Sequence, residues 1–454
     1  MKQYETYKET SQPSIGLIPR NWKIVPIKYV LEQSKDGIKI GPFGSTLTGK
    51  VSPDNKVKVY GQWNIVDQDF TAGKNYVSEE TYNELSSYWI HSGDILISMM
   101  GTVGKCAIIP KNVPKGIMDS HIVKIRLDGS VILPQFFYYV YDKDCSQVVI
   151  EQIQRDRRGS IMDGLNSTLI KGFVIPLPSL SEQQTIASYL DHKVGQIDAA
   201  IKEKEAMLED LKAYRTAIIS EAVTKGLDKN VEMKDSGIEW LGKIPAMWEC
   251  SSLKHFLSQP LQYGANESAE STNPDWPRYI RITDIDEYGN LRDETFKSLD
   301  PDKAKDYLLE KGDVLFARSG ATVGKTYIFN EDYAACFAGY LIKAKCGKKL
   351  LPQFLFLYTN TLQYENWKNS VFIQATIQNI GADKYSLLPI VVPSIEEQQK
   401  IIEYVNTKLG KLDRVLADIQ SQISDLKAYK SSIITEAVTG KVDLRGWKSN
   451  NDKT

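Results

Sequence analysis

Two long stretches of the chain carry apolar residues at alternating steps of four and three. A repeat that averages about 3.5 residues keeps one apolar stripe on the same side of a helix, which is the pattern of a coiled coil. In the first stretch the stripe consists of Leu190, Val194, Ile197, Ile201, Lys204, Leu208, Leu211, Arg215, Ile218 and Ala222. In the second stretch it consists of Val405, Leu409, Leu412, Leu416, Ile419, Ile423, Leu426, Lys430, Ile433 and Ala437. Each stripe needs a partner helix, and the two can satisfy each other.

The two stretches are copies of one sequence. Residues 178–224 align without a gap with residues 393–439, with about 21 identities in 47 positions at a constant offset of 215. The segment LKAYRTAIISEAVT of the first copy, for example, matches LKAYKSSIITEAVT of the second. Because the apolar stripes occupy the same register in both copies, we expect the two helices to pair with each other. Two unrelated amphipathic helices, each packed on its own globular core, are the alternative interpretation.

Both copies begin with a signal for the start of a helix. A serine is followed three residues later by a glutamate, as Ser179 is by Glu182 and Ser394 is by Glu397. This spacing is typical of a capping box, in which the two side chains bond the first free N–H groups of the helix. A helix of about 43 residues is about 65 Å long, at a rise of roughly 1.5 Å per residue. Such a helix is a spacer, longer than a single domain.

The segments of about 170 residues that precede the two helices resemble each other weakly. The matching pieces are IGLIPRNW with LGKIPAMW, GDILISMMGTVGK with GDVLFARSGATVGK, and LPQFFYYV with LPQFLFLY. Apolar runs between glycines predict strands, and the LPQF pieces predict short helices. The predicted fold class is α+β, with two globular domains and two long helices in an internal twofold repeat. The predicted parts are a first domain over residues 1–178, a helix over 179–226, a second domain over 227–393, a helix over 394–440 and a tail over 441–454.

Composition excludes several classes of protein. The chain has 56 basic and 57 acidic residues, so its formal charge of −1 shows no global preference for nucleic acid, and DNA binding needs local patches. The N-terminus has no apolar leader and no apolar run is long enough to span a membrane, so we expect a cytoplasmic protein. The spacings of the cysteines and histidines fit neither a disulfide framework nor a zinc site, so we expect reduced thiols and no metal. These residues are Cys106, Cys145, Cys250, Cys336, Cys346, His91, His121, His192 and His255.

The order and spacing of these pieces resemble those of a known family. The first helix starts with P-L-P-x-L-x-E-Q and the second with V-P-S-I-E-E-Q, and each domain contains G-D-(I/V)-L followed by T-V-G-K. Together with the alternation of domain and helix, these motifs resemble the specificity subunit of type I restriction-modification systems over essentially the whole chain. The helices are strongly similar and the domains only weakly similar. This contrast fits helices that serve as constant connectors and domains that vary in what they recognise.

The resemblance implies DNA recognition without catalysis by this chain. Each globular domain would be a target recognition domain that reads one half of an asymmetric, bipartite site on double-stranded DNA. The helices would pair as an antiparallel coiled coil, which sets the gap between the half-sites and docks two methyltransferase subunits. Restriction and translocase subunits would then join. S-adenosylmethionine, ATP and Mg²⁺ are expected in these partner subunits, because adenine-N6 methylation and ATP-dependent cleavage belong to the assembled complex.

Polar residues at corresponding places of the two domains are candidates for contact with DNA bases. YGQWNIV of the first domain aligns with YIRITDI of the second, which places Gln62 opposite Arg281 and Asn64 opposite Thr283. Arginine suits the edge of guanine, whereas glutamine and asparagine suit adenine. Side chains that contact only solvent are an equal alternative for these positions.

Further candidates lie in loops. The loop GPFGSTLTGK and its counterpart QYGAN can approach the DNA backbone through glycine, although ordinary turns explain the glycines as well. The run QRDRRGS is either a phosphate clamp or a solvated loop. The basic candidates are Lys50, Lys105, Arg155, Arg157, Arg158, Arg318 and Lys325. The polar candidates on the approach to the second helix are Gln374, Thr376, Gln378 and Asn379.

Two other functions compete with DNA recognition. The segment SGATVGKT imitates a phosphate-binding loop, but Ser319 stands where the motif needs glycine and a strand-like run follows instead of a helix. A nucleotide-binding enzyme is therefore disfavoured. NPDW only approaches a methyltransferase motif, and we assign no catalytic residue. The second alternative is a coiled-coil scaffold whose globular domains bind protein, and the helices alone are compatible with it.

Overall fold

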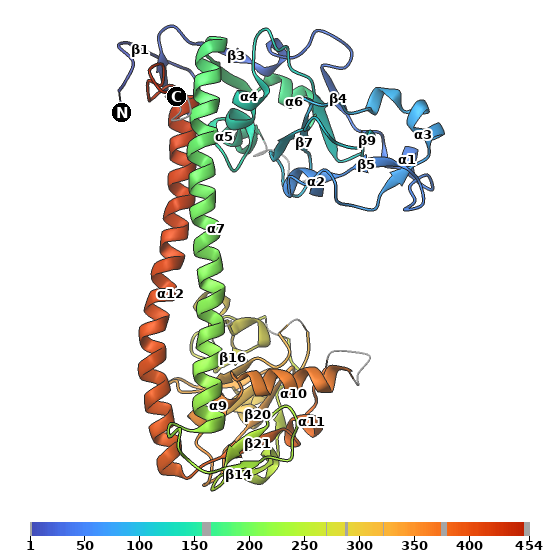
Figure 1. Ribbon diagram of the computed structural model, residues 1–454. Coiled ribbons are helices and arrows are strands. Elements are labelled where there is room, and N and C mark those ends of the chain that lie inside the picture. Colours follow the sequence, from blue (N-terminus) through green and yellow to red (C-terminus); the bar gives the residue numbers. More distant parts are fainter. Residues whose placement is uncertain are drawn as a thin grey trace. The chain divides into compact units, whose positions relative to one another are not determined.

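The computed structural model describes residues 2–156, 165–268, 270–286, 289–320, 322–373 and 379–448 (Figure 1). The chain divides into two compact units, of which the first consists of residues 1–205 and 421–454 and the second of residues 206–420. Each unit contains one globular domain and a segment of both long helices. No helix within the described ranges combines the length and the apolar character that a bilayer span requires.

In the first unit, a four-stranded antiparallel sheet forms the centre of the globular domain. Its strands follow the order β4 (Ile38–Ile40), β10 (Ile122–Ile125), β7 (Ile95–Ser98) and β8 (Cys106–Ile108). A second sheet consists of β6 (Tyr76–Val77), β5 (Val57–Tyr60) and β9 (Gly116–Met118), in which β5 and β9 are parallel. Antiparallel ribbons join β1 (Tyr7–Glu9) with β2 (Leu17–Pro19), and β3 (Lys23–Pro26) with β11 (Val174–Leu177).

Short helices connect these strands. They are η1 (Ile27–Tyr29), α1 (Gly44–Leu47), α2 (Gln62–Val66), α3 (Glu79–Glu84), η2 (Ser86–Tyr88), α4 (Pro134–Tyr141), α5 (Gln147–Asp156) and α6 (Ser167–Gly172). The LPQF piece forms α4, as predicted, with its proline in the first turn, where no helical N–H is lost. Helix α4 packs against β8 and α5, and most of its aromatic side chains are buried.

The second unit repeats this architecture. Its four-stranded sheet follows the order β15 (Gln262–Tyr263), β20 (Leu341–Ala344), β17 (Val314–Ala317) and β18 (Thr326–Ile328). The other pairs are β12 (Met233–Asp235) with β13 (Lys243–Pro245), β14 (Glu249–Ser252) with β21 (Pro389–Val392), and β16 (Arg278–Ile280) in parallel with β19 (Ala335–Phe337). The short helices are η4 (Leu253–Phe256), η5 (Ile282–Asp284), η6 (Asp293–Thr295), α8 (Pro301–Ala304), η7 (Lys305–Tyr307), α9 (Pro352–Tyr358), α10 (Leu362–Ile373) and α11 (Ala382–Ser386).

The segment that imitates a phosphate-binding loop connects two neighbouring antiparallel strands, β17 and β18. The strand begins at Thr326, directly after the lysine of the motif. A phosphate-binding loop needs a helix N-terminus at that point, because the free N–H groups of the first turn hold the phosphate. The fold therefore gives this segment the role of a hairpin connection.

The two long helices are α7 (Leu180–Lys225) and α12 (Ile395–Val438). The predicted capping box forms at the start of α7. The Ser179 Oγ accepts a hydrogen bond from the N–H of Glu182 at 3.3 Å, and the Glu182 carboxylate accepts one from the Ser179 N–H at 3.4 Å. At the start of α12 the corresponding serine accepts a hydrogen bond from the helix N–H at 3.3 Å.

The glutamate three residues after each serine also holds a tryptophan of the adjacent domain. Glu182 accepts a hydrogen bond from the Trp22 indole N–H at 3.2 Å, and Glu397 accepts one from the Trp248 indole N–H at 3.0 Å. Both indole rings are almost fully buried. The tryptophan and the glutamate that both copies share are therefore hydrogen-bond partners, and their contact attaches each domain to a helix.

The glutamine after each glutamate makes a second attachment. Gln398 is fully buried, and its amide donates hydrogen bonds to the carbonyls of Lys349 at 2.8 Å and Pro393 at 2.9 Å. Its carbonyl accepts a bond from the Leu351 N–H at 2.8 Å. Gln183 makes the same three bonds in the first unit. One side chain thus ties the start of the helix to the loop before the LPQF helix.

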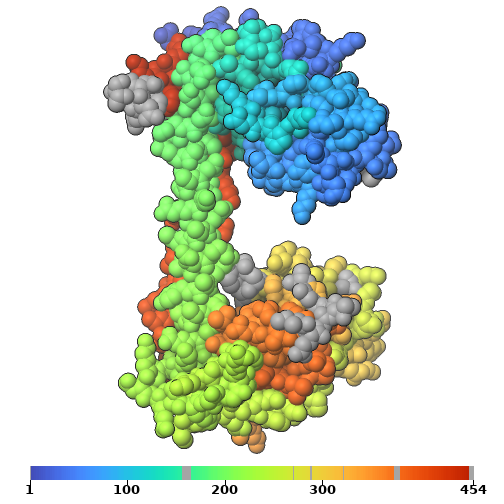
Figure 2. Space-filling view, turned by 45° about the vertical axis from the view of Figure 1, so that its right-hand side comes forward, coloured from blue at the N-terminus to red at the C-terminus, as the bar shows by residue number. Residues whose placement is uncertain are grey.

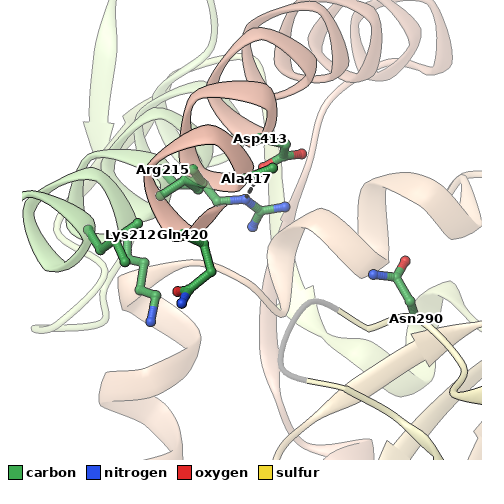
Figure 3. A pocket seen from close by; sticks show the side chains of 8 residues that line it. Lys212, Arg215, Asn290, Asp413, Ala417 and Gln420 are labelled. Atoms are coloured by element: carbon green, nitrogen blue, oxygen red, sulfur yellow. Dashed lines mark hydrogen bonds and ion pairs between the residues drawn. The ribbon is translucent and has the colours of Figure 1, made fainter. Parts of the chain in front are cut away.

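In each unit the two helices contact each other. The contact is antiparallel, because residues later in α7 pair with residues earlier in α12. The cation at one stripe position pairs with an aspartate of the other helix. Lys430 lies 2.7 Å from Asp198 in the first unit, and Arg215 lies 3.3 Å from Asp413 in the second (Figure 3). These two pairs correspond under the offset of 215. The predicted pairing of the helices is confirmed.

The apolar stripe faces the partner helix. Its most buried members, all at most 8 % exposed, are Leu190, Ile197, Ile201, Leu208, Val405, Leu409, Leu412, Leu416, Ile419, Ile423 and Ile433. Its partly buried members include Val194, Leu211, Ile218 and Leu426. The polar stripe residues sit between these layers, and a single polar position of this kind sets the register of a coiled coil.

We expect Gln398→Leu to lower the free energy of unfolding by about 2–3 kcal/mol, because it leaves two carbonyls and one N–H at a buried or partly buried place without their partner. Gln399→Leu is the matched control, since that side chain is exposed. Urea unfolding of the full chain, followed by circular dichroism, measures both. Equal small changes for the two variants would contradict the assigned role of Gln398.

Candidate nucleic-acid interface

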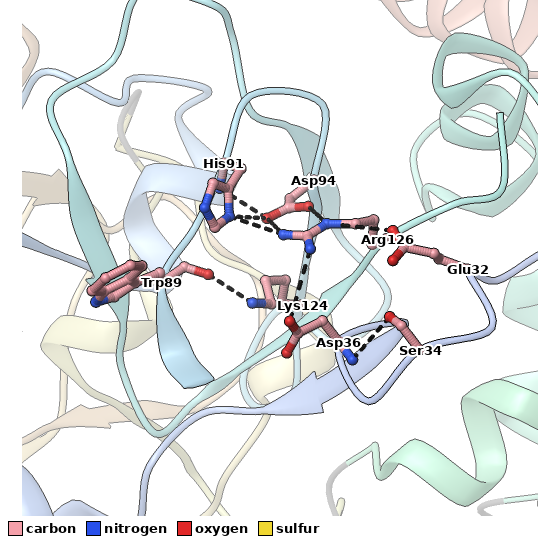
Figure 4. Close-up of polar contacts among 8 residues, drawn as sticks. All are labelled: Glu32, Ser34, Asp36, Trp89, His91, Asp94, Lys124 and Arg126. Carbon is pink, nitrogen blue, oxygen red and sulfur yellow. Dashed lines mark hydrogen bonds and ion pairs between the residues drawn. The ribbon is translucent and has the colours of Figure 1, made fainter. Parts of the chain in front are cut away.

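A buried ion pair holds the loops at one end of the first domain's central sheet. Asp94, 1 % exposed, accepts hydrogen bonds from Arg126 Nε at 2.8 Å and Nη2 at 3.1 Å, and from the N–H of His91 at 2.8 Å (Figure 4). Arg126 also lies 3.9 Å from Glu32 and 4.0 Å from Asp36. One arginine therefore attracts three carboxylates, and the acids of the loop after η1 point toward it.

The second domain uses the same G-D motif in the same way. Asp313 accepts a hydrogen bond from the N–H of Glu310 at 2.9 Å and lies 3.9 Å from Lys343. Burial raises the pKa of Asp313. The glycine before each aspartate has a φ near +90°, which a side chain would strain, so this repeated motif builds a turn. Its role is structural in both domains.

An open groove lies beside strand β4 and α6, and we call it the first-domain groove. Its lining residues are Ile38, Lys39, Ile40, Gly41, Pro42, Phe43, Gly44, Tyr88, Met99, Met100, Ser120, His121, Leu165, Asn166, Ser167 and Lys171. The Phe43 side chain is 85 % exposed, and Lys39 lies over the ring of Tyr88 at 5.4 Å. Lysines and an exposed apolar side chain suit duplex DNA, because ammonium groups bind phosphates and apolar groups can contact the thymine methyl.

The backbone of the groove recurs in the second domain with other side chains. Met99 donates its N–H to the His121 carbonyl at 3.1 Å, as Arg318 does to the Tyr340 carbonyl at 3.0 Å. Gly41 donates to the carbonyl of Ile122 as Gly264 does to that of Leu341, at 2.9 Å and 3.3 Å. We call the corresponding residues Tyr263, Gly264, Arg318 and Tyr340 the second-domain surface.

The second-domain surface presents an arginine that stacks on one tyrosine and bonds through its backbone to another. The Arg318 guanidinium lies 4.8 Å from the centre of the Tyr263 ring, whose hydroxyl accepts a hydrogen bond from the Ala382 N–H at 2.9 Å. Tyr263 and Tyr340 are 44 % and 62 % exposed. Stacking on Tyr263 fixes the plane of the guanidinium, and a fixed fork of donors is what recognition of a guanine edge requires.

Three of the predicted DNA-contacting residues lie at these two surfaces. Gln62 donates a hydrogen bond to the His121 carbonyl at 3.2 Å, next to the first-domain groove. Arg318 is part of the second-domain surface. Asn379 is exposed and pairs through its backbone with Ser319, next to Arg318. These three residues were predicted from three separate segments of the sequence, and the fold brings them to corresponding surfaces of the two domains.

Asn64 and Arg281 have structural roles instead. Asn64 is fully buried, and its side chain bonds the N–H of Gly61 at 2.9 Å and the carbonyl of Asp69 at 2.7 Å, so it cannot reach a base. Arg281 holds the buried Asp284 through two bonds, at 2.6 Å and 3.1 Å. The amide of Asn64 and the Nε and Nη2 groups of Arg281 are therefore already bonded within the protein.

The alignment of these two segments also shifts by one residue. Tyr60 pairs with Met118 as Ile280 pairs with Phe337, so Gly61 corresponds to Arg281. Asn64 then corresponds to Asp284, and the two accept the same hydrogen bond from the backbone three residues earlier. The expected matches of Gln62 with Arg281 and of Asn64 with Thr283 are wrong. Thr283 itself is exposed beside Asp284.

The remaining candidates line neither surface or lie outside the described residues. Lys50 pairs with Glu84 at 3.0 Å, and Lys105 is largely buried and pairs with Asp144 at 2.5 Å. Arg155 donates to the side chain of Gln12, and Lys325 is half-buried in the hairpin connection. The candidates outside the described residues are Arg157, Arg158, Gln374, Thr376 and Gln378.

Sequence analysis missed several residues that line these surfaces, among them Lys39, Lys171, Tyr263 and Tyr340. A further repeat contains the signal for the last of these, because SHIVK of the first domain corresponds to GYLIK of the second. All five cysteines are free thiols, and the described ranges contain no cluster of side chains suited to a metal ion.

A family profile described as type I restriction modification DNA specificity domain matches residues 36–209 and 265–425. The chain belongs to this family. It is the DNA specificity subunit of a type I restriction-modification system, which is the non-catalytic member of the complex. The two matched ranges cover most of both globular domains and reach into both long helices.

Individual relatives agree with the family. The specificity subunit of the type I restriction enzyme EcoBI from Escherichia coli is 24 % identical over 381 residues, 80 % of this chain and 76 % of that protein. The putative MjaX specificity subunit from Methanocaldococcus jannaschii is 24 % identical over 456 residues, 97 % of each chain. A chain from a solved structure on complex assembly and conformational transition of the type I R-M system has the same fold. Its TM-score is 0.67 at 16 % identity, over 94 % of this chain and 99 % of that chain.

We expect Gly41→Ala to distort the first-domain groove of this specificity subunit. A Cβ there would lie 1.6 Å from the Asp119 carbonyl oxygen, so the backbone must move, at a cost of about 1–3 kcal/mol. Gly44→Ala is the control, because its Cβ would come no closer than 4.0 Å to the Ser120 hydroxyl. Thermal unfolding and DNA binding measure the effect, and unchanged melting of Gly41→Ala would refute the close approach.

Proposed function

We propose that the two globular domains read different halves of one bipartite site on double-stranded DNA. The observation that carries this proposal is a contrast between two sets of side chains: those that attach each domain to its helix, and those at the first-domain groove and the second-domain surface. The side chains that attach domain to helix are identical in both units, as Trp22, Glu182 and Gln183 are to their counterparts. The surface side chains differ: Met99 stands where the other domain has Arg318. Identical attachments with unlike surfaces suit two readers of unlike sequences.

The chemistry of each surface favours a particular mode of contact. The first-domain groove offers lysines and an exposed phenylalanine, and Gln62 lies next to it. The second-domain surface offers Arg318 held on a tyrosine ring. Each good bidentate contact to a base favours the correct base over a wrong one by about 1–3 kcal/mol. Lysines, in contrast, bind phosphates without regard to sequence.

The paired helices are proposed to set the gap between the half-sites and to dock two methyltransferase subunits. The segment LKAY is identical in both helices, and its tyrosines, Tyr214 and Tyr429, are 58 % and 52 % exposed. Neither tyrosine packs in a hydrophobic core, so packing does not explain why both copies have it. Figure 2 shows one side of α7 as an uncovered surface. Two exposed copies of one motif fit two identical partners, one for each copy.

The catalytic cofactors are proposed to belong to those partners. Adenine methylation would use S-adenosylmethionine in the methyltransferase subunits, and ATP and Mg²⁺ would serve restriction and translocase subunits. A protein that acts on cellular DNA in this way would work in the cytoplasm.

The test is a footprint of the complex with its methyltransferase partner. We expect two protected clusters of bases on one particular duplex, and Arg318→Ala should relax the base preference in only one of them by about 5–100-fold, as loss of one bidentate contact predicts. Arg281→Ala is the control for a structural arginine and should lower the melting temperature without changing base preference. Binding that is indifferent to sequence would favour a scaffold instead.

We expect Tyr214→Ala and Tyr429→Ala each to remove one of two methyltransferase subunits, with affinity for that subunit reduced about 30-fold, as for a central interface tyrosine. Native mass spectrometry would then show one bound subunit instead of two. Tyr404→Ala is the control, because Tyr404 is 41 % exposed but its copy, Tyr189, is buried. Two bound subunits with unchanged affinity in both variants would exclude the tyrosines from the docking surface.

A further inference from the structure

Four lysines form a strip along one face of the first domain. The first-domain groove contributes Lys39 and Lys171. A neighbouring groove contributes Lys28, Lys35 and again Lys171. The two grooves also share Ile38, so they are continuous. We call Lys28, Lys35, Lys39 and Lys171 the lysine strip.

The acidic residues nearest to the strip are already engaged. Glu32 lines the neighbouring groove and Asp36 follows Lys35 in the sequence, yet both carboxylates lie within 4.0 Å of Arg126 and point toward it (Figure 4). Among the described residues, the recorded ion pairs of the first domain use other lysines, such as Lys50 and Lys115. Lys28, Lys35 and Lys171 are exposed, and Lys39 is half-buried over the Tyr88 ring, so the strip keeps a positive charge that attracts anions.

The corresponding face of the second domain lacks this charge. Strand register places Gln262 where the first domain has Lys39. The backbone bonds before β11 and β21 place Ser386 where the first domain has Lys171. The loop before the strand is shorter in the second domain, so Lys35 has no counterpart. The groove at this position contains one lysine, Lys254, and one aspartate, Asp383.

We propose that the two domains contribute unequally to the affinity for DNA. The lysine strip binds consecutive phosphates and supplies most of the salt-dependent affinity, whereas the second domain contributes mainly contacts to bases. This inference rests on the proposed function, since it assumes that both domains meet one duplex. Phosphate contacts position a protein on DNA and release counterions, so each contact has a measurable salt dependence.

The experiment measures the Kd of the complex with its methyltransferase partner for its target duplex between about 50 and 200 mM salt. The slope of log K against log salt changes by about 0.9 for each phosphate contact. We expect the triple variant Lys35→Gln, Lys39→Gln, Lys171→Gln to reduce the magnitude of that slope by about 2–3, with the bases of both half-sites unchanged. The corresponding triple substitution to arginine should restore the slope, because it restores the charge.

The matched control neutralises three exposed lysines of the same domain that line neither groove: Lys56→Gln, Lys74→Gln and Lys111→Gln. An equal loss of slope in the control would show a general effect of net charge and would overturn the proposal. So would an unchanged slope in the strip variant while the unmodified complex still selects its duplex. A complex that selects no duplex at all would instead refute the proposed function.

Discussion

The attachment of each globular domain to the first turn of a long helix is the constraint on which the other features depend. Three polar side chains make it. In the first unit Glu182 caps the helix and accepts a hydrogen bond from Trp22, while Gln183 bonds three backbone groups from two segments. Trp22 and Gln183 are fully buried, where an unpaired donor or acceptor is expensive. The first turn of the helix can therefore hold the domain in only one orientation.

A strict attachment leaves the rest of each domain free to differ. The hydrophobic interior needs only apolar residues of suitable volume, and the turn of the G-D motif needs only a buried aspartate with a cationic partner, which is Arg126 in one domain and Lys343 in the other. The loops around the groove carry few such requirements. Side chains at these loops can change without disturbing the helix contact, which is what a family of readers with different targets requires.

The unequal charge of the two surfaces follows from the same freedom. A net charge of −1 over the whole chain conceals a local concentration of lysines on the first domain. Arg126 makes that concentration possible, because it draws the neighbouring carboxylates of Glu32 and Asp36 toward itself. Electrostatic attraction to DNA acts over about 10 Å at moderate salt, so the local patch matters more than the sum over the chain.

The sequence by itself determined the helices, their pairing, the twofold repeat and the α+β class, because these features rest on periodicity and on motifs within a few residues. It did not determine which polar residues are available to DNA. Asn64 and Arg281 have suitable chemistry, yet their groups are used by Gly61 and Asp284, and a one-residue shift between the repeats was invisible without strand pairing. Lys39 and Lys171 are 132 positions apart and lie in one groove only because the chain folds. Side-chain availability depends on neighbours that are distant in sequence, and only the tertiary structure supplies them.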